Sequence, residues 1–143
     1  MAEFREMRRK DKLLPEAEAY SRLENASYMT LSTVLENGYP YAVPLNHVLL
    51  DGMIFFHCAL EGQKCDAFRR ESRVCVNAVE SCDVVPDKFT TNYRSALLFG
   101  KISQVDDISL KRAALSAIIR KFSPGFMESG EAYIDRFFEK TAV

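Results

Sequence analysis

Short turn sequences between apolar segments constrain the fold of this chain more than any other feature. Asn37-Gly38 interrupts the apolar stretch 29–45, and Asp51-Gly52 interrupts the stretch 46–58. Such dipeptides tolerate the positive φ angles of a tight hairpin turn, whereas parallel strands need a long crossover. The sequence therefore predicts successive antiparallel hairpins with helices between and after them, that is, a mainly β fold with flanking helices.

One domain is expected over residues 1–143, because 48% hydrophobic content can fill one core and no linker divides the chain. Nineteen basic and twenty acidic residues give a net charge of -1, which argues against a nucleic acid or an anionic membrane as the main partner. No apolar run has the length of a membrane span. The charged start, MAEFREMRRKDKLL, lacks the apolar segment of a secretory signal, so a cytoplasmic protein is expected.

The segment Tyr39–Leu45 contains two prolines, Pro40 and Pro44. Proline donates no hydrogen bond to a ladder, so this segment is expected to be an edge or bulged strand. Its free backbone groups could hold a planar polar ligand, or the prolines could only protect an edge against aggregation.

The stretch Asp51–Glu80 predicts a strand, a corner, a helix and a further strand. The corner carries His57, Gly62 and Lys64. A helix start offers free N–H groups, and Gly62 has no side chain to keep a phosphate from the backbone, so these residues suggest a monophosphate pocket. The alternative is an ordinary loop glycine and a solvated lysine.

Other elements follow from caps and spacing. A helix is expected from Pro15, and a later helix should begin after Asp107 and end at Ser123-Pro124-Gly125. The remaining expectations are a strand at 74–80, a loop at 81–92, a long strand at 93–105 and a last helix at 131–139.

The four cysteines, Cys58, Cys65, Cys75 and Cys82, lack the C-x-x-C spacing of a zinc site, so no metal site is expected. Cys58 and Cys65 flank the proposed pocket and are either redox-sensitive thiols or inert buried ones. His47 is expected to be structural. His57 is expected to donate to an oxygen of the phosphate, with a structural or substrate-contacting role as the alternatives.

Three motifs, taken in order, carry a family resemblance over nearly the whole chain. They are Gly38–Leu45, then Ile54–Ala59 with Gly62-Gln63-Lys64, then Tyr93-Arg94-Ser95 running to Phe99-Gly100. Together they resemble the pyridoxamine 5'-phosphate oxidase-like flavin-binding proteins, and most closely the nitroimidazole resistance (Nim) group. The resemblance implies a split β-barrel, antiparallel, six-stranded and of Greek-key topology. In relatives, a further strand after the equivalent of Thr141-Ala142-Val143 closes the barrel, so the resemblance leaves closure open for a sequence that ends at Val143.

The resemblance also implies a homodimer with two FMN molecules at the subunit interface. The ring-system contacts fall on Val43, Pro44, Leu45 and Asn46, and the phosphate contacts on His57, Gly62 and Lys64. Tyr93 and Arg94 match a motif near the cofactor, without indicating which subunit's flavin they face. FMN is expected rather than FAD, because the sequence has no dinucleotide fingerprint such as G-x-G-x-x-G.

Three functional classes stay open. The first is an FMN-dependent oxidoreductase that reduces a small electron-poor substrate, such as a nitroaromatic or a quinone, with electrons from NAD(P)H or another reductant. The second is a haem-handling protein in which His47 or His57 ligates iron. The third is a flavin-binding module without turnover.

Overall fold

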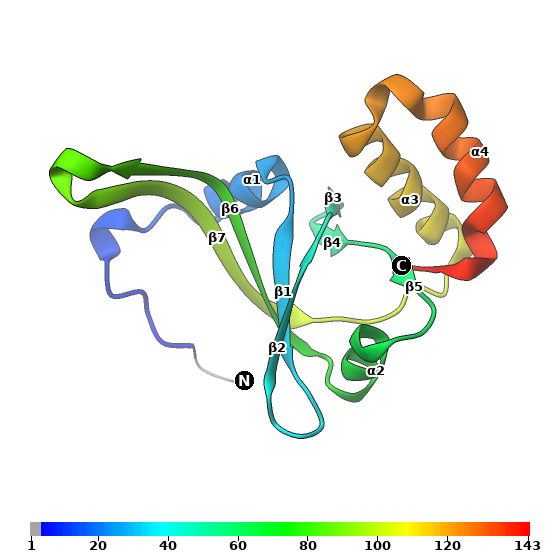
Figure 1. The fold of residues 1–143 in the computed structure, drawn as a ribbon, viewed down its shortest axis with the longest axis horizontal. Coiled ribbons are helices and arrows are strands. Elements are labelled where there is room, and N and C mark those ends of the chain that lie inside the picture. The colour runs from blue at the N-terminus through cyan, green and yellow to red at the C-terminus, as the bar shows by residue number, and fades with distance from the viewer. Residues whose placement is uncertain (1–3) are drawn as a thin grey trace.

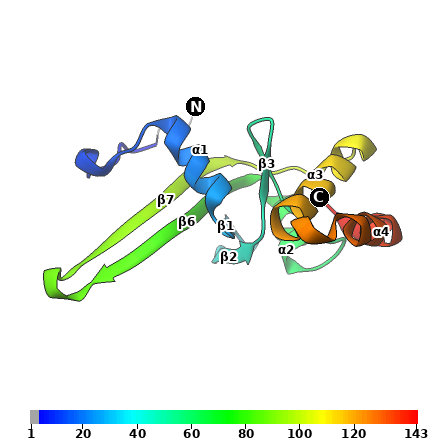
Figure 2. The same ribbon diagram turned by 90° about the horizontal axis from the view of Figure 1, so that it is seen from above.

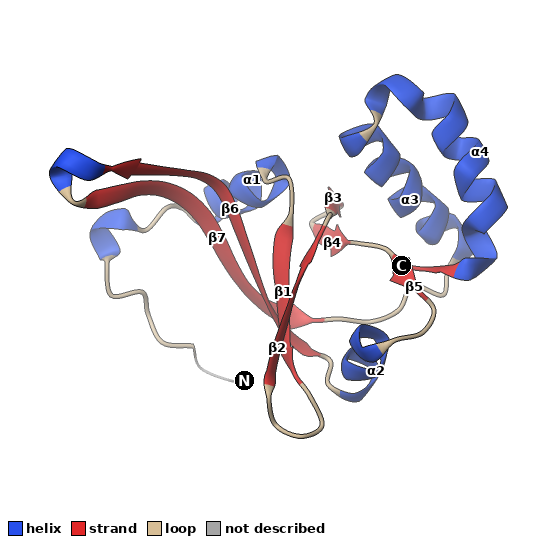
Figure 3. Cartoon of the chain, viewed as in Figure 1, coloured by secondary structure: helices blue, strands red, loops and turns tan. Residues whose placement is uncertain are grey.

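The computed structural model describes residues 4–143, which form four α-helices and eight β-strands (Figures 1 and 3). The helices are α1 (Glu16–Asn25), α2 (Gln63–Arg70), α3 (Ile108–Phe122) and α4 (Met127–Phe137). The strands are β1 (Met29–Val34), β2 (Pro40–Leu45), β3 (Val48–Leu50), β4 (Met53–Phe55), β5 (Cys58–Ala59), β6 (Arg73–Val85), β7 (Thr90–Lys101) and β8 (Thr141–Ala142). Short 3₁₀ turns lie at Lys10–Lys12, Pro86–Lys88, Pro124–Phe126 and Phe138–Lys140.

All strand pairs among the described residues are antiparallel, as the turn sequences predict. The main sheet has the order β2-β1-β6-β7, and β3-β4 and β5-β8 form two separate ladders. β2 pairs with β1 only, so the proline-containing strand lies at the edge of the main sheet, as predicted. Within residues 4–143, this pairing leaves the second edge of β2 free.

The last residues lie between two other parts of the chain. β8 pairs with β5 through Cys58 and Ala142, and the Val105 N–H donates to the Val143 carbonyl at 2.9 Å. These contacts link β5 to the segment that follows β7. The ladders among the described residues contain four, two and two strands, so the closed six-stranded barrel stays a prediction.

The prediction of a loop at 81–92 is wrong, because β6 and β7 form one long hairpin that extends away from the other elements (Figure 2). Their ladder continues to Val85↔Thr90, and only Pro86–Phe89 turns the chain. The β-branched residues Val84 and Val85 opposite Thr90 and Thr91 explain the continued pairing. We call the part of this hairpin beyond the register shift at Val79/Ser81 the arm.

Two clusters of buried side chains form the core. The first lies between α1 and the main sheet and contains Leu23, Ala26, Met29, Leu31, Val76, Ala78 and Ala96. The second joins α3 to the β3–β4 hairpin and contains Val48, Phe55, Ala114, Ala117 and Ile118. The helix predicted from Pro15 therefore packs on the sheet, and α3 covers the small hairpin.

The predicted cap of α3 is confirmed, since the Leu110 N–H donates to Asp107 Oδ1 at 2.7 Å. α4 begins at Met127, four residues before the predicted start at 131. Gly130 lies inside α4, where a Cβ would come within 2.5 Å of the Ile119 side chain, so this glycine permits close packing of α4 on α3. No helix within residues 4–143 combines the length and apolar composition that a membrane span requires.

Candidate functional site

The predicted corner is present between β5 and α2. Gly62 precedes the helix with φ 127° and ψ 167°, and no side chain caps the helix start. The Asp66 N–H donates to the Gly62 carbonyl and begins the helical hydrogen bonds, which leaves the N–H groups before it without helical acceptors. A Cβ at Gly62 would have no atom within 4 Å, so the space beside the backbone is open. This geometry suits an anionic group.

Lys64 is half-buried in the first turn of α2, and its ammonium makes no ion pair or hydrogen bond within residues 4–143. Asp66 is the acidic residue of this turn, and it pairs instead with Arg69 at 3.6 Å. Arg69 also donates to the Leu60 carbonyl at 2.8 Å, which ties the helix to the corner. Lys64 is therefore the cation of this corner whose charge is left for an external anion.

His57 immediately precedes β5, and its side chain reaches solvent. Desolvation by neighbouring atoms lowers the pKa of His57, and the positive charge of Lys64 lowers it further. The charge of Lys64 therefore acts on the His57 imidazole, so the two side chains belong to one corner. A neutral imidazole there can still donate one hydrogen bond to an oxygen.

The residues predicted to contact the ring system lie at the end of the edge strand β2. Val43, Pro44 and Leu45 are on the strand, and Asn46 follows it directly. Val43 pairs with Leu31 and Pro44 with Thr30, both on the β1 side. The Asn46 amide already donates to the Ser27 carbonyl at 2.9 Å, so its carbonyl oxygen is the atom left for another partner.

Tyr93 and Arg94 lie on the β7 side of the arm, opposite Cys82 and Ser81. Tyr93 is 52% exposed, and the Lys12 ammonium lies 5.4 Å from the centre of its ring. The arm points away from α2 (Figures 1 and 2), so one chain does not bring these residues to the Lys64 corner. The structure thus brings His57, Gly62 and Lys64 together and leaves Tyr93 and Arg94 apart from them.

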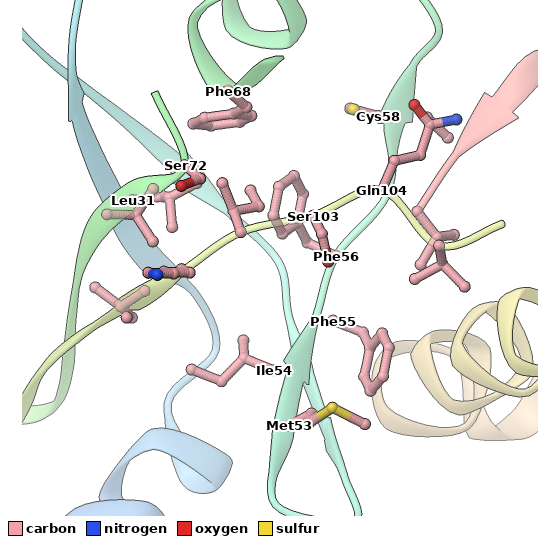
Figure 4. Close-up of a pocket in the computed structure, with 18 of the residues that line it drawn as sticks. Leu31, Met53, Ile54, Phe55, Phe56, Cys58, Phe68, Ser72, Ser103 and Gln104 are labelled. Atoms are coloured by element: carbon pink, nitrogen blue, oxygen red, sulfur yellow. The ribbon is translucent and has the colours of Figure 1, made fainter. Parts of the chain in front are cut away.

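A cavity of about 760 Å³ lies beside the corner. Its lining comes mainly from apolar side chains on the strands and α2, including Leu31, Ile54, Phe56, Phe68, Val76 and Leu98 (Figure 4). Cys58 and Cys65 also line it, but none of the nine predicted cofactor-binding residues does. Arg69 and Lys101 line it too, but Arg69 is already paired with Asp66 and bonded to the Leu60 carbonyl. Because Lys64 lies at the open helix start and not in the cavity lining, we assign the anionic group to the corner.

His47 is fully buried, as expected of a structural histidine. Its Nε2 lies 2.6 Å from the Leu23 carbonyl, and Nδ1 has no partner among the described residues. Burial lowers the pKa of His47, against the opposing effect of the Leu23 carbonyl. Lys121 Nζ donates to the Ala26 and His47 carbonyls at 3.0 Å each.

The hydrogen bonds of Arg69 and Lys121 to backbone carbonyls could not be predicted, because a backbone carbonyl carries no residue-type signal in the sequence. Within residues 4–143, no group of three or more His, Cys, Asp or Glu side chains could hold a metal ion.

Comparison with known proteins supports the sequence resemblance. A model of the family described as pyridoxamine 5'-phosphate oxidase matches residues 15–135. No curated protein sequence matches the chain.

Among solved structures, a proposed 5-nitroimidazole antibiotic resistance protein from Bacteroides thetaiotaomicron is 25% identical, with a TM-score of 0.67 over 78% of this chain and 68% of that one. A conserved hypothetical protein from Mycobacterium tuberculosis is 18% identical and shares the fold, with a TM-score of 0.81 over 96% of this chain and 82% of that one. An FAD- and haem-binding protein from Mycobacterium smegmatis is 19% identical, with a TM-score of 0.70; the match covers 90% of this chain and only 63% of that one.

Proposed function

This chain belongs to the pyridoxamine 5'-phosphate oxidase family, and from that membership we propose that it is a flavoprotein that binds FMN at the α2 corner. The observation that carries the proposal is the uncapped start of α2, where Gly62 leaves open space and the Lys64 ammonium has no partner within residues 4–143. These features fit a phosphate monoester, which accepts N–H hydrogen bonds and pairs with a lysine.

His57, from its position beside Lys64, would donate to a phosphate or ribityl oxygen. Val43, Pro44 and Leu45 on the edge strand β2, and Asn46 directly after it, would contact the ring system, with free backbone groups and the carbonyl oxygen of the Asn46 side chain as polar partners. FMN, when bound, supplies hydride and single-electron chemistry, while the protein orients it. We propose that the reaction reduces a small electron-poor substrate, of the nitroaromatic or quinone class, with electrons from a nicotinamide or another donor.

We also propose that the protein is a homodimer with FMN between the chains. A single chain leaves large apolar side chains on the β6–β7 hairpin exposed, among them Val84 (70%), Phe89 (96%) and Leu97 (58%). Exposed apolar area of this kind is typical of a surface that another chain covers. A partner chain could also bring Tyr93 and Arg94 to a flavin that they do not reach within their own chain. Sedimentation of the flavin-loaded protein as a monomer at micromolar concentration would contradict the dimer.

The experiment that tests the cofactor is the absorption spectrum and mass of whatever molecule copurifies, followed by titration of the apoprotein with FMN and FAD. We expect flavin absorption bands and tighter binding of FMN than of FAD, because the corner has one free lysine for one phosphate. Oxidation of NADH or NADPH in the presence of a nitroaromatic or a quinone then separates an enzyme from a flavin-binding module without turnover. Tighter binding of FAD would contradict the corner as the terminal phosphate site.

Haem is the second candidate ligand. The observation in its favour is that the His57 imidazole has no hydrogen-bond partner within residues 4–143 and reaches solvent, so it could ligate iron. His47 is a poorer ligand, because its Nε2 is bonded to the Leu23 carbonyl in the core. A Soret band in the copurified protein, lost in His57→Ala, would favour this function over the first.

A further inference from the structure

Two thiols meet at the corner, one from β5 and one from α2. The sulfur atoms of Cys58 and Cys65 lie 3.8 Å apart. Cys65 is 8% exposed and donates to the Ala59 carbonyl at 3.1 Å, while Cys58 is half-buried. Both residues line the large cavity, and Figure 4 shows Cys58 on β5 at its edge. A small solute that enters the cavity can therefore reach the pair.

The residues around this pair of thiols favour a disulfide over a metal site. A zinc or iron site takes three or four protein ligands, and no third His, Cys, Asp or Glu joins the two thiols within residues 4–143. The sulfur atoms are in van der Waals contact, and a bond between them needs a further approach of ~1.8 Å, to an S–S distance of about 2.05 Å. Cys75 and Cys82, both on β6, make no such contact with another thiol in the described part of the chain.

We propose that Cys58 and Cys65 form a reversible intrachain disulfide when the protein meets a hydroperoxide. One thiolate attacks the peroxide, which leaves a sulfenic acid and releases the alcohol, or water in the case of hydrogen peroxide. The sulfur of the second cysteine then displaces the hydroxyl group as water and forms the S–S bond. In sum, two thiols and one hydroperoxide give one disulfide, one alcohol and one water, and a dithiol reductant reverses the oxidation of the pair.

The pKa of Cys58 affects both the rate at which the disulfide forms and how readily it is reduced. Burial and the neighbouring Cys65 raise the pKa of Cys58 to about 11, although Lys64 and Arg69 act in the opposite direction. Since the thiolate is the nucleophile, a Cys58 thiol that stays protonated at neutral pH reacts slowly. The same environment gives the reduced pair no thiolate stabilisation, and a disulfide whose reduced form is not stabilised is a weak oxidant. We expect slow formation and a persistent product.

The disulfide would close a loop that consists of the corner itself. Between the two cysteines lie Ala59–Lys64, which include Gly62 and Lys64. Oxidation would thus restrict the segment in which the anionic group is proposed to bind. The disulfide itself does not depend on FMN, so its test and the test of the cofactor can fail separately.

The test is a peptide map of the full-length protein. The reduced protein is treated with hydrogen peroxide, the peroxide is removed with catalase, free thiols are alkylated, and the chain is cleaved with trypsin without reduction. Cleavage after Lys64 puts Cys58 on peptide 23–64 and Cys65 on peptide 65–69, while Cys75 and Cys82 share peptide 74–88. We expect peptides 23–64 and 65–69 to be joined, and the join to disappear after a dithiol reductant. Separate alkylated peptides, or separate sulfinic acids, would overturn the proposal.

Variants give matched controls. Cys58→Ser should abolish the join and leave Cys65 open to alkylation, whereas Cys75→Ser should leave the join intact. Cys82→Ser removes the exposed thiol and so excludes links between chains through that residue. If Cys65→Ser does not fold, the map of the parent chain still decides. A join that involves Cys82 in the parent, with none between Cys58 and Cys65, would contradict the inference.

Discussion

The two histidines of this chain lie in regions built from the same residue types but with different partners. In the core, His47 contacts the Leu23 carbonyl, and Lys121 donates to the Ala26 and His47 carbonyls. At the corner, His57 lies near Lys64, and neither side chain has a hydrogen-bond partner within residues 4–143. Burial lowers the pKa of His47, and desolvation followed by Lys64 lowers that of His57.

The difference teaches that residue type alone does not identify a site. A half-buried lysine or a buried histidine that bonds to backbone carbonyls has a structural role, because its polar groups are already used. The same side chains at an uncapped helix start remain available to a ligand. Substitutions in one region at a time, with stability and FMN binding both measured, distinguish the two kinds of residue.

The largest expected effect is on the stability of the core region. His47→Ala should lower the free energy of unfolding by about 2–4 kcal/mol, because it leaves a cavity and an unpaired Leu23 carbonyl. His57→Ala should change it by less than about 0.5 kcal/mol, since the side chain is exposed. Urea denaturation without cofactor measures both. Equal losses for the two variants would mean that the corner histidine is also structural.

The next effect is on cofactor binding. Lys64→Ala should lower FMN affinity roughly tenfold to a hundredfold, because a charge-assisted contact is worth about 1.5–3 kcal/mol. Flavin fluorescence titration measures it. Lys88→Ala, in an exposed turn, is the control for positive charge in general, and Lys121→Ala should lose stability with no direct effect on the corner. If Lys64→Ala binds FMN like the parent, the phosphate must be sought near Arg69, Arg70 or Arg94.

The two histidines should also make stability depend on pH. The folded state holds each pKa below the ordinary value of about 6.5, so below that pH the unfolded chain binds protons that the folded chain does not. Stability is therefore lost as pH falls from about 6.5 toward the lowered pKa, by at most about 1.4 kcal/mol per pH unit for the buried His47 and by less for His57, whose charge the solvent screens. Above about pH 7.5 neither histidine contributes.

Urea denaturation across this pH range, with His47→Gln and His57→Gln as comparisons, measures the contribution of each region. Each variant should reduce the slope of the free energy of unfolding against pH by the contribution of the histidine that it lacks. An unchanged slope in both variants would assign the loss to carboxylates instead.

The smallest expected effect is that of Gly62→Ala. Its φ of 127° is rarely adopted by a residue with a side chain, and no neighbour obstructs a Cβ, so the cost of about 1 kcal/mol comes from the backbone alone. FMN affinity should fall as well, because the methyl group fills the space beside the N–H groups. Gly125→Ala is the matched control, since that glycine has open space and no positive φ. A stable Gly62→Ala variant with parental FMN affinity would contradict the role of the open corner.

The elements with local signals could be predicted from sequence. The strand at 29–34, the helix after Gly62 and the Asp107 cap all depend on neighbouring residues, and the structure confirms them. The errors came from tertiary packing. The pairing of β6 with β7 continues through a polar segment that by itself predicts a loop, and α4 begins four residues before the predicted start, where Gly130 packs against Ile119.

In the candidate site too, the positions of residues close in sequence could be predicted, and those that depend on long-range packing could not. His57, Gly62 and Lys64 are close in sequence, so their meeting at one corner could be predicted. The place of Tyr93 and Arg94 relative to the cofactor depends on how two chains meet, which local patterns do not encode. The sequence predicts that Cys58 and Cys65 flank the pocket, but not that their sulfur atoms are in contact. That contact depends on how β5 and α2 pack together.

The Lys121 tie has a consequence for the order of folding. It joins α3 to carbonyls 95 and 74 residues away in the sequence, whereas the paired residues of the β6–β7 hairpin are 5 residues apart beside the turn (Val85↔Thr90) and 28 apart at its open end (Arg73↔Lys101). Closing long segments of chain costs entropy before their contacts form, so the hairpin can form early and the tie only late. Mutation of Lys121 should therefore speed unfolding more than it slows folding, and its φ-value should lie near zero.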